Sequence, residues 1–137
     1  MASSTQALAT RRAEEAFRHA QRATANAFGW SRGPTARLDV NRNSARSLTE
    51  AADAYLVAAD ALEEAGDLHR ADTAMANARQ LLVEARRTIE WVAIRLESQE
   101  ELDLAAANEM WAVGLELAGR IGDIDRRVAG HHFLEQA

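Results

Sequence analysis

An apolar repeat without a gap constrains this chain more than any other feature of its sequence. Between residues 68 and 96, nine apolar residues follow one another at alternating steps of three and four. They are Leu68, Ala71, Met75, Ala78, Leu82, Ala85, Ile89, Val92 and Leu96. This spacing places all nine on one face of an α-helix. We therefore predict a continuous helix over residues 67–97, about 46 Å long, that packs nearly antiparallel to its neighbours.

Two helices are predicted before this segment. The first runs over about residues 5–28 and ends at Gly29. The loop that follows, over about residues 29–43, contains the single proline of the chain, within a Gly-Pro turn. Because Ser47 lies three residues before a glutamate, a capping box opens the second helix, which runs to about Ala65.

Two helices are also predicted after it. Ser98 belongs to another capping box, so we expect the chain to break there. The next apolar stripe runs from Leu102 to Ile124 with an eleven-residue period, which favours a straight or right-handed helix. Gly122 and Asp123 are residue types that end one helix and cap another, so a short C-terminal helix should follow. The sequence predicts an all-α, Ala-rich antiparallel helical bundle of four main helices plus this short one.

The core of such a bundle should be thin. The chain contains 31 alanines, whereas Leu, Ile, Val and Phe together number only 27 of its 137 residues. Alanine is the best helix former, but its methyl group buries little apolar area. We therefore expect close helix contacts, and we expect self-association into a homo-oligomer or a partner protein to add stability.

Charge divides the chain into two parts within one domain. Residues 1–47, a basic N-terminal helix and Gly/Pro/Arg loop, carry eight arginines and three acids. Residues 48–137, an acidic helical body, carry eight arginines and 18 acids. A basic arm of this kind can contact a polyanion, or it can lie on an acidic protein surface, its own or a neighbour's. The net charge of −5 favours the second interpretation.

One segment resembles a known repeat. Residues 55–78 begin with an aromatic residue and have small residues where two helices would cross. The residues that carry this pattern are Tyr55, Ala58, Ala59, Leu62, Gly66, Leu68, Ala71, Met75 and Ala78. In these residues the segment resembles a tetratricopeptide repeat, and there is a partial second match around 91–134. One register of this match, 56 residues on, aligns Trp111 with Tyr55, and a competing register places Trp91, Ile94, Leu104 and Ala107 on the pattern instead. The resemblance implies stacked helical hairpins that present a groove to a peptide or protein. A plain bundle hairpin of alanine-rich helices is the alternative.

Motifs for chemistry are not found. The chain has no cysteine, which excludes disulfides and thiolate sites, and it has no phosphate-binding glycine loop and no H-E-x-x-H motif. His131 and His132 are adjacent, so on a helix they point about 100° apart and cannot chelate one metal together. We predict a solvated histidine pair and a protein that is not an enzyme, without cofactor or metal. With neither a membrane span nor a secretory signal, the expected location is cytoplasmic.

Arginines and tryptophans are the candidate partner-binding residues. They are Trp30, Arg32, Arg37, Arg42, Arg46 and Trp91. An aromatic among arginines suits an acidic protein surface, and it also suits a nucleic acid, whose bases stack on tryptophan. A third interpretation is a loop that packs back onto the bundle. Trp91 has arginines four residues before and after it, which allows a guanidinium over its indole ring. Trp91 is then either a partner-binding residue or, as we favour, a tryptophan at the edge of the core that is shielded by the arginine stems.

Three functions remain compatible with these observations. We predict a non-catalytic protein–protein interaction module, such as an adaptor, an assembly factor or a small inhibitor, that uses a helical surface and the basic arm. The alternative is a nucleic-acid-associated regulatory protein that binds through the Arg-rich residues 30–46. A further alternative is a structural subunit of a larger assembly, for example a viral one.

Overall fold

The computed structural model describes residues 4–29 and 31–136, the last three as backbone only. The described residues form four helices: α1 (Ser4–Ala27), α2 (Leu38–Glu64), α3 (Leu68–Glu97) and α4 (Leu104–Gln136). They contain no strand, so the predicted all-α antiparallel bundle of four main helices is confirmed. No described helix is both long enough and apolar enough to cross a membrane.

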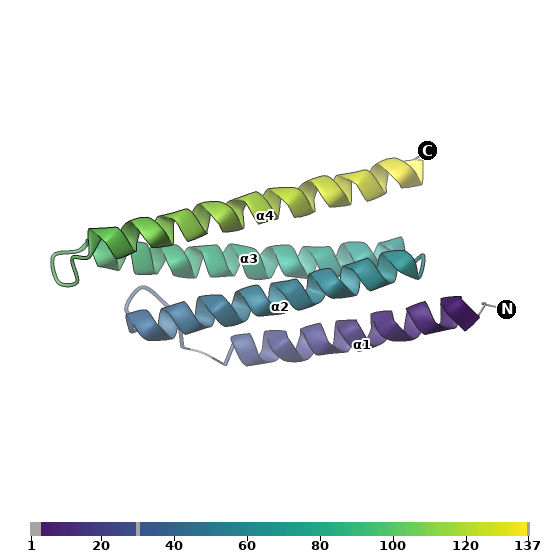
Figure 1. Ribbon diagram of the computed structural model, residues 1–137, viewed down its shortest axis with the longest axis horizontal. Helices are drawn as coiled ribbons and strands as arrows, with labels where there is room; N and C mark the ends of the chain where they lie inside the picture. Colours follow the sequence, from purple (N-terminus) through teal and green to yellow (C-terminus); the bar gives the residue numbers. More distant parts are fainter. Residues whose placement is uncertain (1–3, 30, 137) are drawn as a thin grey trace.

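The four helices form an open array. They lie side by side in chain order, with α1 and α4 at opposite edges (Figure 1). Each helix packs mainly on its neighbours in the chain, α1 on α2, α2 on α3, and α3 on α4. Longer side chains also connect helices two apart, as where Arg70 of α3 lies over the Phe17 ring of α1. Because the array is not closed into a ring, each edge helix keeps one face outside.

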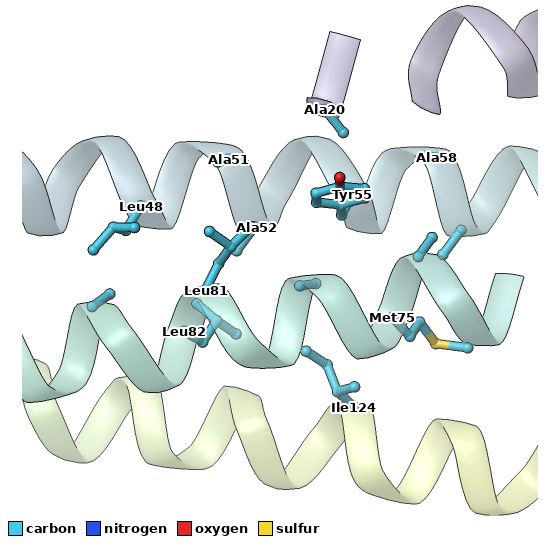
Figure 2. Packing of buried hydrophobic residues seen from close by; sticks show 14 of the residues in the cluster. Ala20, Leu48, Ala51, Ala52, Tyr55, Ala58, Met75, Leu81, Leu82 and Ile124 are labelled. Carbon is cyan, nitrogen blue, oxygen red and sulfur yellow. The ribbon is translucent and has the colours of Figure 1, made fainter. Parts of the chain in front are cut away.

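Alanine dominates the interior. Of the 27 buried apolar residues in the described part of the chain, 15 are alanines, and all four buried residues of α1 are alanines. Figure 2 shows Ala51, Ala52 and Ala58 of α2 among the larger side chains of Leu82 and Met75 from α3. Because a methyl group projects little from the backbone, the helices approach closely and a few larger side chains fill the remaining space. The expected thin core is present.

The hairpin between α2 and α3 forms as predicted, and α3 is continuous. Gly66 has a left-handed backbone with φ +82°, and the backbone N–H of Asp67 donates to the carbonyl of Leu62 at 2.9 Å. The Asp67 carboxylate then accepts the N–H of Arg70 at 3.1 Å and caps α3. The segment 55–78 is therefore an antiparallel helical hairpin. Its membership of the tetratricopeptide repeats stays a prediction.

The second helix begins earlier than predicted, at Leu38 rather than at Ser47. Its buried stripe continues before residue 47 through two polar residues, Asn41 and Ser44. The Asn41 amide donates to the carbonyl of Gly33 at 2.9 Å and accepts the Gly33 N–H at 3.1 Å. Because this polar side chain is satisfied by the loop, it occupies a buried position where an apolar residue was expected.

The predicted short C-terminal helix is not a separate element, because α4 continues through Gly122. Unlike Gly66, Gly122 has no positive φ. Ile121, Ile124 and His131 extend the buried stripe of α4 across this point. Their packing outweighs the cost of a glycine within a helix, about 1 kcal/mol. The two Gly-Asp pairs, at residues 66–67 and 122–123, therefore lie in different local structures.

Candidate functional site

The structure separates the predicted contact residues. Trp30 lies outside the described residues. Arg32 and Arg37 belong to the loop before α2, whereas Arg42 and Arg46 lie one turn apart on α2 itself, where a loop and then a helix start were predicted. The Arg-rich segment is thus half loop and half helix, and its arginines face different surroundings.

The loop is docked onto α3 by Arg32. Its Nη2 lies 3.3 Å from Oε2 of Glu84, and its guanidinium lies 4.8 Å from the centre of the Phe28 ring. With a side chain that is 19% exposed, Arg32 holds the loop against the bundle. Arg37 is 81% exposed and pairs with Asp39 at 3.1 Å. For Arg32, therefore, the interpretation of a loop that packs back onto the bundle is the one that the structure supports.

Trp91 is half-buried on α3. Glu84 lies seven residues before it and Arg95 four residues after it, so all three share one flank of the helix, which faces the loop. The predicted guanidinium over the indole does not form within the described residues. Arg87 instead pairs with Glu84 at 3.6 Å, and Arg95 pairs with Glu101 at 3.6 Å and donates to a backbone carbonyl of the loop. Both arginines therefore pair with oxygen atoms instead of lying over the Trp91 ring: Arg87 with a carboxylate, and Arg95 with a carboxylate and a backbone carbonyl.

Arg42 and Arg46 line a groove of about 350 Å³ between α2 and α4. Most of its apolar lining comes from α3 and α4, namely Ile89, Met110, Val113 and Leu117, and Ala45 of α2 adds to it. Arg42 and Arg46 are both exposed, and within the described residues neither has a hydrogen bond or an ion pair. The groove therefore combines an apolar floor with a rim on α2 that carries two unpaired cations and the exposed carboxylate of Glu50. The sequence predicted the cations, and the resemblance implied a groove, but neither placed it between α2 and α4 beside these arginines.

The groove is open because α2 and α4 are joined at only one end. The two helices run parallel, on either side of α3 (Figure 1). In the second half of α2, Asp53 pairs with Arg120, and both Asp60 and Glu63 pair with Arg127. No ion pair joins the first half of α2 to α4 among the described residues. The seam between the helices is consequently closed beyond residue 53 and open before it.

A buried histidine that sequence reasoning missed lies at the closed end. His131 is only 5% exposed, so the prediction of a solvated pair was wrong for this residue. Its Nδ1 lies 2.5 Å from a carboxylate oxygen of Asp72, and its Nε2 lies 3.0 Å from one of Glu63. The signal was present, because residue 131 follows the buried Ile124 by seven positions and so lies on the same face.

This cluster connects helices and offers little free chemistry. Both ring nitrogens of His131 contact carboxylates, so neither is open to a substrate. In the described residues, no group of three or more His, Asp or Glu side chains is arranged to hold a metal ion. Comparison with other proteins adds no assignment. No protein-family model matches the sequence, and no curated protein or solved structure is detectably similar to it.

Proposed function

We propose that the protein is a non-catalytic interaction module that binds an acidic amphipathic helix of a protein partner in the groove between α2 and α4. The observation that carries this proposal is the pairing of an apolar floor with the unpaired Arg42 and Arg46. An amphipathic helix lays its apolar face into such a groove. Carboxylates at the edge of that face would then meet the two guanidinium groups.

The two parts of the groove have different tasks. Exposed ion pairs contribute only about 0.2–1 kcal/mol each, because water and salt screen them. Arg42 and Arg46 therefore select and orient an acidic partner rather than supply most of the affinity. Most of the binding free energy comes from the apolar residues, at about 25 cal/mol per Å² of apolar surface covered. Met110 and Val113 are only half-buried in the free protein, so a bound helix can cover them further.

Two synthetic peptides test the proposal. Both form the same amphipathic helix, one with glutamates and one with lysines beside the apolar face, and fluorescence anisotropy measures binding to the full chain. We expect the glutamate peptide to bind, and we expect affinity to fall about tenfold in the Arg42→Gln/Arg46→Gln variant. Arg37→Gln, an exposed arginine outside the groove, is the matched control and should bind as the unaltered chain does.

A second variant tests the contribution of the apolar floor separately from that of the arginines on the rim. Val113→Asp places a charge on the apolar floor and should remove binding of the glutamate peptide, with circular dichroism confirming that the variant is folded. Equal binding of both peptides would contradict the assigned role of the arginines. A single-stranded DNA oligonucleotide is the third probe, and its binding in place of the glutamate peptide would favour the nucleic-acid alternative.

A further inference from the structure

One flank of α4 carries a second apolar stripe, beside the one that packs on α3, and Trp111 in this stripe still donates its indole N–H to Glu97 of α3. Its members follow one another at steps of seven, four and three: Leu104, Trp111, Leu115, Ala118, Gly122, Ala129 and Phe133. Leu104, Leu115 and Phe133 are 58%, 72% and 71% exposed. A helix that is apolar on two sides is typical of one covered on two sides. In the monomer, α3 covers only one.

The opposite edge of the array, which is formed by α1, has a polar outer face. The outer face of α1 carries exposed charged side chains: Arg11, Glu14, Arg18 and Arg22. Stacked helical arrays need a polar outer face on the helix that ends them, and α1 provides one. Head-to-tail stacking of α4 on the α1 of another copy would bury these charges against Leu115 and Phe133. The chemistry of α1 therefore disfavours an open filament and favours contact between like edges.

We propose that α4 pairs antiparallel with α4 of a second copy, about a two-fold axis at residues 118 and 119. In this register Leu115 of each copy lies opposite Gly122 of the other, and Leu104 lies opposite Phe133. Leu115 thus meets a residue without a side chain near the axis, beside the Arg126 guanidinium that lies 3.5 Å from where a Cβ of Gly122 would be, and Leu104 and Phe133 close the seam at its two ends. The same surface serves both copies, as a two-fold interface requires.

Gly119 and the charges of α4 fit the same register. A Cβ added at Gly119 would meet no atom within 4 Å, so packing inside the monomer does not require glycine there, although glycine disfavours a helix. Arg126 of one copy, which pairs with Asp123 and keeps a 73% exposed side chain, comes level with Trp111 of the other, so that a cation lies beside the face of an indole ring whose N–H is already bound to Glu97. The two Arg126 residues are about 22 Å apart along the helices, well beyond the Debye length of about 10 Å. The antiparallel helix dipoles also attract.

The size of the contact sets its strength. From Leu104 to Phe133 the seam is about 44 Å long, and at a helix width of about 10 Å it covers roughly 450 Å² on each copy. Standard interfaces cover about 800 Å² on each partner, so we expect a dimer that dissociates in the micromolar range.

Sedimentation equilibrium of the full chain, from about 1 µM to about 500 µM, measures this dimer. Leu115→Glu should leave only monomer across the range. Val57→Glu, which changes a residue on α2 that is 60% exposed, is the matched control and should dimerise as the unaltered chain does. Monomer at the highest concentration, or a dimer unaffected by Leu115→Glu, overturns the proposal.

Single cysteines test the register, because the chain has none of its own. Gly119→Cys places two thiols beside the axis, so a short bis-maleimide should link two copies. Ala129→Cys, on the same outer side, places them about 31 Å apart along the helices and should not be linked. Equal linking of both variants would show a parallel pair, and linking of neither would show a different interface. Either result would refute the antiparallel register.

Discussion

Nδ1 of His131, on α4, lies 2.5 Å from Oδ1 of Asp72, on α3. Because Nε2 of the same ring lies 3.0 Å from Glu63 on α2, one imidazole joins three helices. Arg127 also pairs with Glu63, so this end of the seam between α2 and α4 is held by several polar contacts. The groove proposed as the binding site lies at the other end, where no such contacts hold α2 to α4 among the described residues.

Replacing this histidine should destabilise the fold. His131→Ala removes both contacts and leaves the carboxylates of Asp72 and Glu63 without the ring, at an expected cost of about 1–3 kcal/mol. His132→Ala is the matched control, because that side chain is 60% exposed and lies 3.4 Å from Asp72. It should change the free energy of unfolding by less than about 0.5 kcal/mol. Urea denaturation measures both, and equal losses would refute a buried structural role.

Two buried polar residues on α2 should respond in opposite directions. Within the described residues, the Ser44 hydroxyl is buried with no hydrogen-bond partner, whereas the Asn41 amide makes two bonds to Gly33. Ser44→Ala removes an unsatisfied group and adds helix propensity, so we expect stability to rise by up to about 1 kcal/mol. Asn41→Ala leaves the Gly33 backbone groups unpaired and should cost about 1–3 kcal/mol. Thermal and urea unfolding would contradict this account if Ser44→Ala were the more damaging change.

These residues also explain which parts of the fold could be predicted from the sequence. The helix over residues 68–97 was predictable because its apolar repeat has no gap. The start of α2 was not, because Asn41 and Ser44 occupy buried positions in its stripe. The buried Asn41 amide is satisfied by the loop backbone at Gly33, whereas the buried Ser44 hydroxyl has no hydrogen-bond partner among the described residues. A periodicity argument does not include such contacts.

The same limit applies to the candidate site. Arg42 and Arg46 were identifiable as unbalanced cations, because few acids lie near them in the sequence. The groove beside them depends on how α4 lies relative to α2, which follows from contacts such as Asp53 with Arg120, 67 residues apart. Arg32 was also expected to contact a partner. In the structure it forms an ion pair with Glu84, which lies 52 residues away in the sequence.

Alanine substitutions at Gly66 and Gly114 should have opposite effects on stability, because only Gly66 needs a backbone conformation that favours glycine. Gly66 has φ +82°, so Gly66→Ala forces a side chain into the left-handed region at a cost of about 1–2 kcal/mol. Gly114 lies within α4, and a Cβ there would meet no atom within 4 Å. Gly114→Ala should therefore stabilise the protein by about 0.5–1 kcal/mol. The comparison is made by urea denaturation, and a loss of stability in both variants would contradict the assigned difference.

The α1 edge should open before the rest of the array. Its buried residues are alanines, and its half-buried Phe17 meets Tyr55 of α2 edge-on, with ring centroids 5.6 Å apart and planes at 79°. Such a ring pair adds about 0.5–1.5 kcal/mol beyond the area that it buries. Phe17→Ala should therefore lower the opening free energy of α1 by about 2–3 kcal/mol and leave the protection of α3 nearly unchanged.

Native-state hydrogen exchange measures the protection of each helix separately. Leu8→Ala, at a residue that is 45% exposed on the same helix, should have a much smaller effect. A uniform loss of protection over α1 and α3 would instead mean that the four helices unfold as one cooperative unit.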